Sequence, residues 1–357
     1  MKPSRPVSAV VCNYNGALYL PECIDALLAQ ETDLDELIVV DNCSTDDSVA
    51  LMAERYPDVR VIEMPSNDGP SSARNAGMRA ARNRWVLAVD NDAMLAPDVL
   101  TKLLAAADER EDVSALQPRS VFHHDPSRVH YDGGAAHYAG LVALRNFYRP
   151  ASEAVGEGVV DVDVVISVCL LVDRDMVMEV GGYDERYFIL FEDLDLSYRL
   201  RLSGRALVCV EDAIVLHRAG TPGVSFREGT DYPASRVFYH SRNRWLYMAK
   251  CFRCWTLFVA LPGLIVYEAV WFLFAVLQGG LFAWLRGKWA VLSTLGEVCR
   301  MRKEAQRLRK VPDRELLVGG PLTLTPGLKA GGLSGLLARA LDGALRLWWG
   351  VVRRIAA

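Results

Sequence analysis

The segment Trp85-Val86-Leu87-Ala88-Val89-Asp90-Asn91-Asp92 is an apolar run that ends in two carboxylates one residue apart. The run Trp85–Val89 predicts a short buried β-strand. In open α/β sheets, ligands bind outside the carboxyl ends of the strands, so Asp90 and Asp92 are expected at a binding edge. Carboxylate oxygens there suit Mg²⁺ or Mn²⁺, hard cations that bridge protein oxygens to phosphate oxygens. An isolated Asp-x-Asp is also a common solvated turn, so the rest of the sequence must decide between the two.

Apolar runs and helical patterns alternate through the first hundred residues. The pattern predicts strands at 7–11, 37–40, 59–64 and 85–89, and helices at 18–30, 44–56, from 69 onward and at 97–107. Further along, it predicts strands at 164–172, 206–210 and 213–216, with a helix from 192 to about 204. This alternation favours an α/β fold with a mostly parallel sheet. Residues 115–165 look less regular, and we expect the variable acceptor-binding region there.

Composition narrows the class of protein. The chain has 357 residues, 51% of them hydrophobic, which is enough for one large or two small domains. A net charge of -4 gives no case for nucleic-acid binding. No secretory signal precedes the strand at Val7, so we expect the eight cysteines to be reduced thiols in the cytoplasm.

The C-terminal part of the sequence has a different character. Seven of the eight tryptophans follow residue 244, and Glu268 is the only charged residue in 255–284. Such a run can span a bilayer once or form a helical hairpin within one leaflet. Residues 333–355 predict an amphipathic helix, with an apolar face formed by Leu337, Leu341, Ala344, Trp348 and Val352. We therefore expect a catalytic domain over 1–250 and a helical, membrane-associated region over 251–357. The alternative is that these helices pack on the catalytic domain or on a second copy in a homodimer.

An ordered series of short motifs runs through residues 6–250. The series consists of Val-Val-Cys-Asn-Tyr-Asn (10–15), Ile-Val-Val-Asp-Asn-Cys-Ser-Thr-Asp (38–46), Asn67 with Gly69, Ala-Arg-Asn-Ala-Gly (73–77), Asp-Asn-Asp (90–92), Phe-Glu-Asp-Leu-Asp (191–195) and His217. In this order and spacing the chain resembles the family-two, inverting glycosyltransferases with the Rossmann-like GT-A fold. Within that family it looks most like the rhamnosyltransferase-type enzymes of bacterial surface-polysaccharide assembly.

The resemblance implies a nucleoside diphosphate sugar as donor. The residues that it places around the donor are Asn13, Asn15, Asp41, Asn67, Arg74, Asn75 and Asp90. The carboxylate of Asp41 can accept a hydrogen bond from N3–H of uracil or thymine, which favours a UDP- or dTDP-sugar, with dTDP-rhamnose as one candidate. Alternatively, Asp41 only caps a turn at the end of a strand, and Arg74 is only a solvated charge on a helix.

The resemblance also implies a metal and a base. Asp92, Asp90 and His217 would hold Mg²⁺ or Mn²⁺, which neutralises the diphosphate leaving group. Inversion requires a general base for the acceptor hydroxyl; we assign Asp193, with Glu192 in reserve. The alternative for His217 is a structural histidine. The alternative for the acids at 192–195 is a helix N-terminus rich in acids, which the helix dipole favours, and Asp195 fits this alternative.

Ser241-Arg-Asn-Arg-Trp245 departs from a related pattern. Processive synthases of the superfamily carry Gln-x-x-Arg-Trp, whereas this chain has Ser241 at the glutamine position and keeps Arg244 and Trp245. The chain also lacks the several spanning helices of a polymer channel. Both differences favour transfer of a single sugar, and Arg244 is expected to contact a phosphate of donor or acceptor.

These inferences converge on an enzyme at the cytoplasmic face of a bacterial inner membrane. We expect it to transfer one sugar to a saccharide or a polyprenyl-diphosphate-linked acceptor. A nucleotidyltransferase would instead show a glycine-rich phosphate loop after the first strand, and Asn13-Tyr-Asn-Gly16 is not one. A non-catalytic membrane scaffold of a glycan assembly complex is the other alternative. The sequence leaves open whether 255–285 spans the membrane or lies in its plane.

Overall fold

The computed structural model describes residues 5–154, 156, 158–218, 232–323 and 332–356. The chain forms two compact units. Unit 1 comprises residues 1–133, 145–200 and 205–219, and unit 2 comprises 134–144, 201–204 and 220–357.

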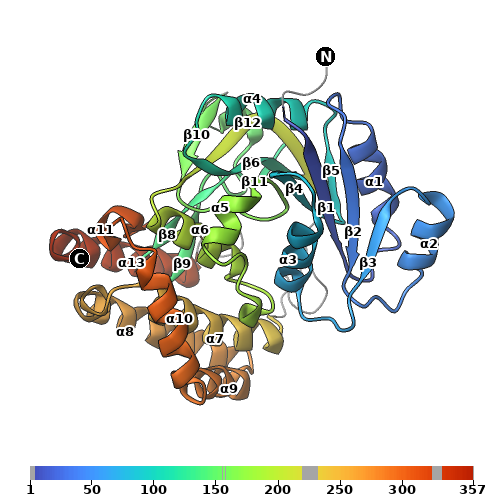
Figure 1. Cartoon of the computed structure of the whole chain (residues 1–357). Coiled ribbons are helices and arrows are strands. Elements are labelled where there is room, and N and C mark those ends of the chain that lie inside the picture. Colours follow the sequence, from blue (N-terminus) through green and yellow to red (C-terminus); the bar gives the residue numbers. More distant parts are fainter. Residues whose placement is uncertain (1–4, 155, 157, 219–231, 324–331, 357) are drawn as a thin grey trace. The chain divides into compact units, whose positions relative to one another are not determined.

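Unit 1 is built on a ten-stranded sheet with the order β10-β12-β6-β11-β4-β1-β2-β3, to which β5 is added beside β12 and β7 beside β6 (Figure 1). Strands β4, β1, β2 and β3 are parallel, and β11 runs antiparallel to β4 and β6. The expected α/β fold is confirmed, but the sheet is mixed rather than mostly parallel, because β5, β7, β10 and β11 pair antiparallel with their neighbours. The strands are β1 Val7–Asn13, β2 Glu36–Asp41, β3 Arg60–Glu63, β4 Trp85–Asp90, β5 Ala93–Leu95, β6 Val113–Phe122, β7 Val129–Tyr131, β10 Val159–Val162, β11 Cys169–Asp173 and β12 Ala206–His217.

Helices pack on the sheet of unit 1 through apolar faces. They are α1 Leu20–Leu28, α2 Ser48–Arg55, α3 Pro70–Ala80, α4 Val99–Asp108, α5 Arg174–Glu179 and α6 Glu192–Leu202, with 3₁₀ turns at Ala151–Glu153 and Glu185–Tyr187. Helix α1 buries Leu20, Ile24 and Leu27, whereas Leu28 is 60% exposed. Helix α3 lies close against β1, because a Cβ on Gly77 would be 2.2 Å from Cγ1 of Val10.

The expectation of an irregular segment over 115–165 was wrong in its first part. Residues 113–122 form β6, a strand in the middle of the sheet, and all ten of its residues are buried. Its polar residues concealed it in the sequence: Arg119, for example, is buried and paired with Asp132 and Glu211 at 3.3 and 3.2 Å. The two strands expected at 206–216 are one strand, β12, with a register shift between Val210 and Ile214.

Unit 2 is mainly helical. Its elements are β8 Gly134–His137, β9 Leu141–Leu144, α7 Ala234–Cys251, α8 Cys254–Leu277, α9 Leu281–Leu292, α10 Leu295–Arg307, α11 Asp313–Leu316, β13 Leu317–Val318, α13 Gly332–Val352 and a 3₁₀ turn Arg353–Ile355. Helix α7, which we placed at the end of the catalytic domain, groups with these elements. The apolar run breaks at Gly279, where φ is 70°.

The face of α13 that packs inside unit 2 includes Val352 of the expected apolar face, together with Leu345 and Trp349, which lie outside it. Leu345, Trp349 and Val352 are buried, whereas Leu337 is 60% exposed and Ala344 is also exposed. The ring of Trp349 stacks on Tyr138 with centroids 4.8 Å apart, so a tertiary contact selects the buried face.

Helix α8 is long and apolar enough to cross a membrane by length and composition alone, with a mean hydropathy of 2.0 in its most apolar segment.

Candidate functional site

The candidate site lies at the carboxyl ends of the parallel strands in unit 1. Asn13 ends β1, Asp41 ends β2 and Asp90 ends β4. The register places Asn13 opposite Asp41 and Cys12 opposite Asp90. The strand-end residues that we expected at one edge are therefore neighbours across the sheet.

Asp41 and the two asparagines after β1 form a hydrogen-bonded cradle. Nδ2 of Asn13 donates to Oδ1 of Asp41 at 2.7 Å, and Ser44 donates to Asp41 through its N–H and its hydroxyl at 2.8 and 2.6 Å. Asn15 has a φ of 48° and accepts from the N–H of Thr45 at 2.7 Å. Because Asp41 is only 3% exposed and both its oxygens already accept bonds, a nucleobase can use only the lone pairs that remain.

Asn67 and Asn75 act on the backbone around the site. Oδ1 of Asn67 accepts from Gly69 N–H at 3.1 Å, at the start of α3. Asn75 donates to the carbonyl of Tyr183 and to Glu185, both at 2.8 Å, and accepts from Tyr183 N–H at 2.9 Å. The amide of Asn75 thus joins α3 to the segment 183–185.

Arg74 lies in the middle of the site and is 4% exposed. Its Nη2 donates to Oδ1 of Asp90 at 2.6 Å and to the carbonyl of Ser167 at 3.3 Å. Nη1 is 4.0 Å from Oε1 of Glu192, and the guanidinium lies 5.4 Å from the ring centroid of Tyr183. Among the described residues, Nε and Nη1 have no hydrogen-bond acceptor. A buried guanidinium with unused N–H groups is well suited to bind a phosphate.

Asp90, Asp92 and His217 come together as a group of potential metal ligands. One ligand atom from each lies within 4.8 Å of the others, and Nε2 of His217 is 3.3 Å from Oδ1 of Asp92. The pairing of β12 with β5, which sets His217 opposite Ala93, brings the histidine to the end of β4. Burial, with Asp92 nearby, raises the pKa of Asp90 even though Arg74 opposes the shift. A divalent cation would relieve the repulsion between the two carboxylates.

The sequence interpretation missed His130, which touches this group. Its Nδ1 is 3.0 Å from Nδ1 of His217, and the two rings stack with centroids 4.9 Å apart. Burial, followed by the charge of His217, lowers the pKa of His130 to about 2, so that its ring is neutral. One Nδ1 of the pair must donate and the other accept. His130 lies in β7, a strand of three residues that gives no periodic signal.

The two acids at the start of α6 have different surroundings. Asp193 is partly exposed, and its carboxylate accepts from the N–H of Ser167 at 3.2 Å and from the Ser167 hydroxyl. Glu192 is 7% exposed, and burial, followed by the charge of Asp193, raises its pKa to about 8. Glu192 is therefore mostly protonated at neutral pH. Asp195 is buried and accepts from Tyr187 and Arg199 at 3.0 and 2.7 Å, which confirms the structural interpretation.

The backbone before α6 has an uncommon conformation. Phe188, Leu190 and Phe191 have φ values of 62°, 67° and 77°, a left-handed region that side chains with a Cβ rarely adopt. Gly69, with φ of 88°, faces this loop, and a Cβ there would be 2.3 Å from the carbonyl oxygen of Phe188. Only glycine allows the start of α3 to approach the loop that leads to the two acids.

Arg244 lies in unit 2 rather than in unit 1. It is 1% exposed, and its Nη1 donates to Oε2 of Glu268 at 2.9 Å. The guanidinium also lies 4.5 Å from the ring centroid of Tyr267. Its side chain is thus occupied inside the helical unit, and its contact with a phosphate stays a prediction.

Comparison with known proteins identifies the family. Residues 8–181 match the family described as glycosyl transferase family 2. The N-acetylglucosaminyl-diphospho-decaprenol L-rhamnosyltransferase of Mycobacterium tuberculosis is 30% identical over 267 residues, which make up 68% of this chain and 83% of that protein. The chain belongs to glycosyl transferase family 2. The succinoglycan biosynthesis protein ExoO of Rhizobium meliloti is 40% identical to this glycosyltransferase over 124 residues, 32% of this chain and 36% of the relative.

A solved structure shares the fold of this glycosyltransferase. The crystal structure of GalNAc-T7 with UDP, GalNAc and Mn²⁺ superimposes with a TM-score of 0.57 and 16% identity, over 72% of this chain and 51% of that one. The likeness shows the GT-A fold, in agreement with the expectation from the motifs.

The protonated state of Glu192 predicts a pH dependence of stability. Folding raises its pKa from 4.5 to about 8, so its stabilising contribution is complete below pH 4.5 and disappears as the pH rises to 8. The loss is up to about 1.4 kcal/mol per pH unit. In chemical denaturation of the metal-free glycosyltransferase, Glu192→Gln should reduce this slope. Glu179→Gln, at an exposed glutamate, is the matched control. Equal slopes for wild type and Glu192→Gln would mean that Glu192 is ionised in the folded protein.

Proposed function

We propose that this family 2 glycosyltransferase transfers one sugar, with inversion, from a UDP- or dTDP-sugar to a saccharide or polyprenyl-diphosphate-linked acceptor. The observation that carries the proposal is the convergence of Arg74 with the Asp90–Asp92–His217 group at one strand edge. The guanidinium offers unused N–H groups to a diphosphate. The name of the mycobacterial relative makes dTDP-rhamnose the first donor to test and a prenyl-linked sugar the first acceptor.

The donor set fits a divalent cation. Two carboxylates and one imidazole can supply oxygen and nitrogen ligands within 4.8 Å of one another, as Mn²⁺ and Mg²⁺ accept. Asp92 and His217 would hold the cation together with Asp90, which also pairs with Arg74. When bound, the cation stabilises the negative charge that develops on the departing diphosphate. Asn13, Asn15, Asp41 and Asn67 would contact or shape the nucleoside part, and Asn75 positions the segment beside Arg74.

Asp193 is the better general base of the two acids. A base must be ionised before it can take a proton, and burial keeps Glu192 protonated at neutral pH. Asp193 is partly exposed, so an acceptor hydroxyl can reach it. Ser167 donates two hydrogen bonds to Asp193 and fixes the direction of its carboxylate. Glu192 would then set the charge around Arg74 rather than remove the acceptor proton.

We place the reaction at the cytoplasmic face of the bacterial inner membrane. A polyprenyl chain would hold the acceptor in the bilayer, and unit 2 contains the apolar helix α8 that can reach it. The name of the mycobacterial relative, which acts on a decaprenol-linked sugar, supports this location.

The first experiment is a donor screen. Purified full-length protein with Mn²⁺ is incubated with UDP-, dTDP- and GDP-sugars, and release of the nucleoside diphosphate is recorded with and without a prenyl-diphosphate-linked sugar. We expect release from one UDP- or dTDP-sugar. No release and no nucleotide binding from any donor, with either acceptor condition, would favour the non-catalytic scaffold.

Replacement of the base should separate chemistry from binding. Asp193→Asn cannot accept the acceptor proton, so transfer should fall about 10²- to 10⁴-fold while the affinity for the nucleoside diphosphate stays within a few fold. Steady-state transfer and nucleotide titration measure the two effects. Asp175→Asn changes an exposed carboxylate of the same unit and should leave both unchanged. Near-normal turnover of Asp193→Asn would remove Asp193 from the mechanism.

His130 should support the metal through His217. In His130→Phe the ring stack can remain but the bond to Nδ1 of His217 is lost, so Mn²⁺ affinity should fall about 10- to 100-fold. Titration followed by electron paramagnetic resonance measures this without donor. His130→Asn, whose amide oxygen can accept the same bond, should recover part of the affinity, and His124→Phe, at an exposed ring nearby, is the control. Wild-type affinity in His130→Phe would exclude the role.

A further inference from the structure

Helix α8 has one covered face and one bare face within unit 2. Thr256, Val259, Gly263, Leu264, Trp271 and Ala275 are among its buried residues. At its N-terminal end, Trp348 donates to the carbonyl of Val259 and Trp255 donates to the carbonyl of Ile355, at 3.0 and 2.7 Å. Near its C-terminal end, Trp271 donates to the hydroxyl of Ser241 in α7 at 2.9 Å. The helix is thus held along its length by other parts of the unit.

The opposite face of α8 is exposed and carries no charge. Its exposed large side chains are Trp255, Phe258, Leu261, Ile265, Val266, Val270, Phe272, Leu273, Val276 and Leu277. Trp255, Phe258, Leu261 and Ile265 follow one another at intervals of three and four residues, and so do Val266, Val270, Leu273 and Val276, so that two neighbouring rows cover one half of the helix. Exposed Phe282, Leu285 and Trp289 continue the apolar surface on α9. We call these thirteen residues the apolar strip. A contiguous apolar surface of this length marks an interaction site rather than a surface in contact with water.

The covered face of α8 contains a cluster of charges near the middle of the helix. Glu268 pairs with Arg244 of α7 and Lys288 of α9 at 2.9 and 2.6 Å. The N–H groups of Trp245 and Trp284 also donate to Glu268, at 3.0 and 3.1 Å. Glu268 lies about 21 Å along a helix about 36 Å long, at a rise of 1.5 Å per residue. The only charged residue of α8 therefore points into unit 2, not into the apolar strip.

This cluster distinguishes two ways in which α8 could meet a bilayer. If α8 crossed the membrane, Glu268, Arg244 and Lys288 would lie near the centre of the hydrocarbon, together with the helices α7 and α9 that pack beside them. Charged groups at that depth are costly. If α8 lies in the plane, the apolar strip faces the acyl chains while the charge cluster remains on the protein side.

We propose that unit 2 is an in-plane anchor that inserts the apolar strip into one leaflet of an anionic membrane, without crossing it. The inference rests on the membrane location given above and specifies its mode. Trp255, at the start of α8, and Trp289, on α9, are both exposed members of the apolar strip, and such rings prefer the interface between headgroups and acyl chains.

Charge supports a lipid surface as the occupant. Residues 234–357 contain 19 lysines and arginines against six acidic residues, a net charge of +13 in a chain whose net charge is -4. Basic segments next to an inserted apolar surface bind anionic headgroups. Arg253, Arg286, Arg353 and Arg354 are exposed beside the two ends of α8 or on α9. A second copy of the chain would bring these cations against one another, which disfavours self-association through the apolar strip.

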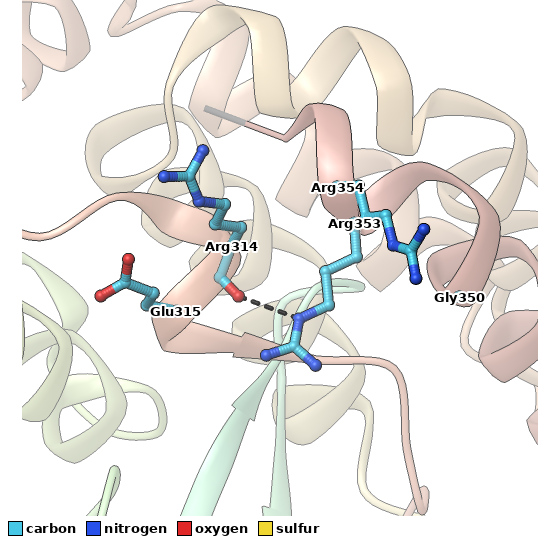
Figure 2. A pocket seen from close by; sticks show the side chains of 5 residues that line it. All are labelled: Arg314, Glu315, Gly350, Arg353 and Arg354. Atoms are coloured by element: carbon cyan, nitrogen blue, oxygen red, sulfur yellow. Dashed lines mark hydrogen bonds between the residues drawn. The ribbon is translucent and has the colours of Figure 1, made fainter.

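Three arginines of this basic surface line a pocket near the end of α13. It has a volume of about 440 Å³ and is lined by Arg314, Glu315, Gly350, Arg353 and Arg354 (Figure 2). Nε of Arg353 donates to the carbonyl of Arg314 at 3.1 Å, which joins the end of α13 to α11. Ile355, which follows Arg354, accepts the hydrogen bond from Trp255, so Arg353 and Arg354 adjoin the N-terminal end of the apolar strip. Arg353 and Arg354 are both exposed and extend the basic surface beside the apolar strip, where anionic headgroups would lie.

The topology of α8 is tested with thiol labelling of the full-length protein in membranes. Cys254 is an exposed native thiol at the start of α8, and Gln278→Cys adds one just after its end, in a background with Cys43→Ser and Cys299→Ser. A membrane-impermeant maleimide should label both positions in inverted vesicles and neither in intact spheroplasts. Labelling of the two positions from opposite sides would show a spanning helix and overturn the proposal.

Binding to vesicles tests the apolar strip and the basic pocket. Phe258→Asp with Leu273→Asp should lower binding to phosphatidylcholine–phosphatidylglycerol vesicles at least about tenfold, whereas Leu28→Asp, at an exposed leucine of unit 1, should not. Arg353→Gln with Arg354→Gln should remove most of the gain that phosphatidylglycerol gives, and Arg60→Gln is the control.

Three results would contradict the in-plane anchor. They are unchanged vesicle binding in the strip variant, loss of a dimer in that variant with no effect on lipid, and the absence of any preference for anionic vesicles. None of these measurements uses transfer activity. Failure of the donor screen with normal vesicle binding would therefore refute the proposed reaction alone.

Discussion

The ion pair between Arg74 and Asp90 is the contact on which the candidate site depends. It connects α3 to the end of β4, and the same guanidinium reaches the carbonyl of Ser167 and approaches Glu192. Since Ser167 in turn holds Asp193, the guanidinium of Arg74 connects the candidate metal ligands with the acid pair. The pair is buried on the arginine side and 27% exposed on the aspartate side, so Asp90 can still meet a ligand. Without Asp90, the buried guanidinium of Arg74 would be an uncompensated charge, which is strongly destabilising. Each residue of the pair is therefore needed for the stability of the site as well as for its chemistry.

Much of unit 1 could be predicted because its strands are short apolar runs that end at polar residues. The strands 85–89 and 37–40 and the helix after Gly69 were found from that pattern, and Asp41 and Asp90 lie where strand ends should place them. Strand β6 was missed because its polar side chains have partners that only the fold supplies, such as Asp132 and Glu211 for Arg119. His130 was missed for the same reason, since its contact with His217 joins residues 87 positions apart.

The state of the two acids also lay beyond sequence reasoning. Glu192 and Asp193 are adjacent carboxylic acids that the sequence does not distinguish. In the structure, Glu192 is buried near Arg74, whereas Asp193 accepts hydrogen bonds from Ser167 and is partly exposed. Burial depends on how α3 and the loop 188–191 close over the start of α6. In unit 2 the sequence showed that Glu268 was isolated, but the partners that neutralise it, Arg244 and Lys288, lie on other helices.

The contact between Gly69 and the loop before α6 has a consequence for how specificity can change. The N–H of Gly69 donates to Oδ1 of Asn67, a residue that we propose beside the sugar donor, and its missing Cβ leaves room for the carbonyl of Phe188 in the loop before the proposed base. The loops that we propose for the two substrates therefore meet at one backbone junction. If these roles hold, a lineage that adapts this enzyme to a new donor by moving residues 67–69 will also displace the residues that lead to the proposed base. Donor and acceptor preference should drift as a coupled pair rather than as separate traits.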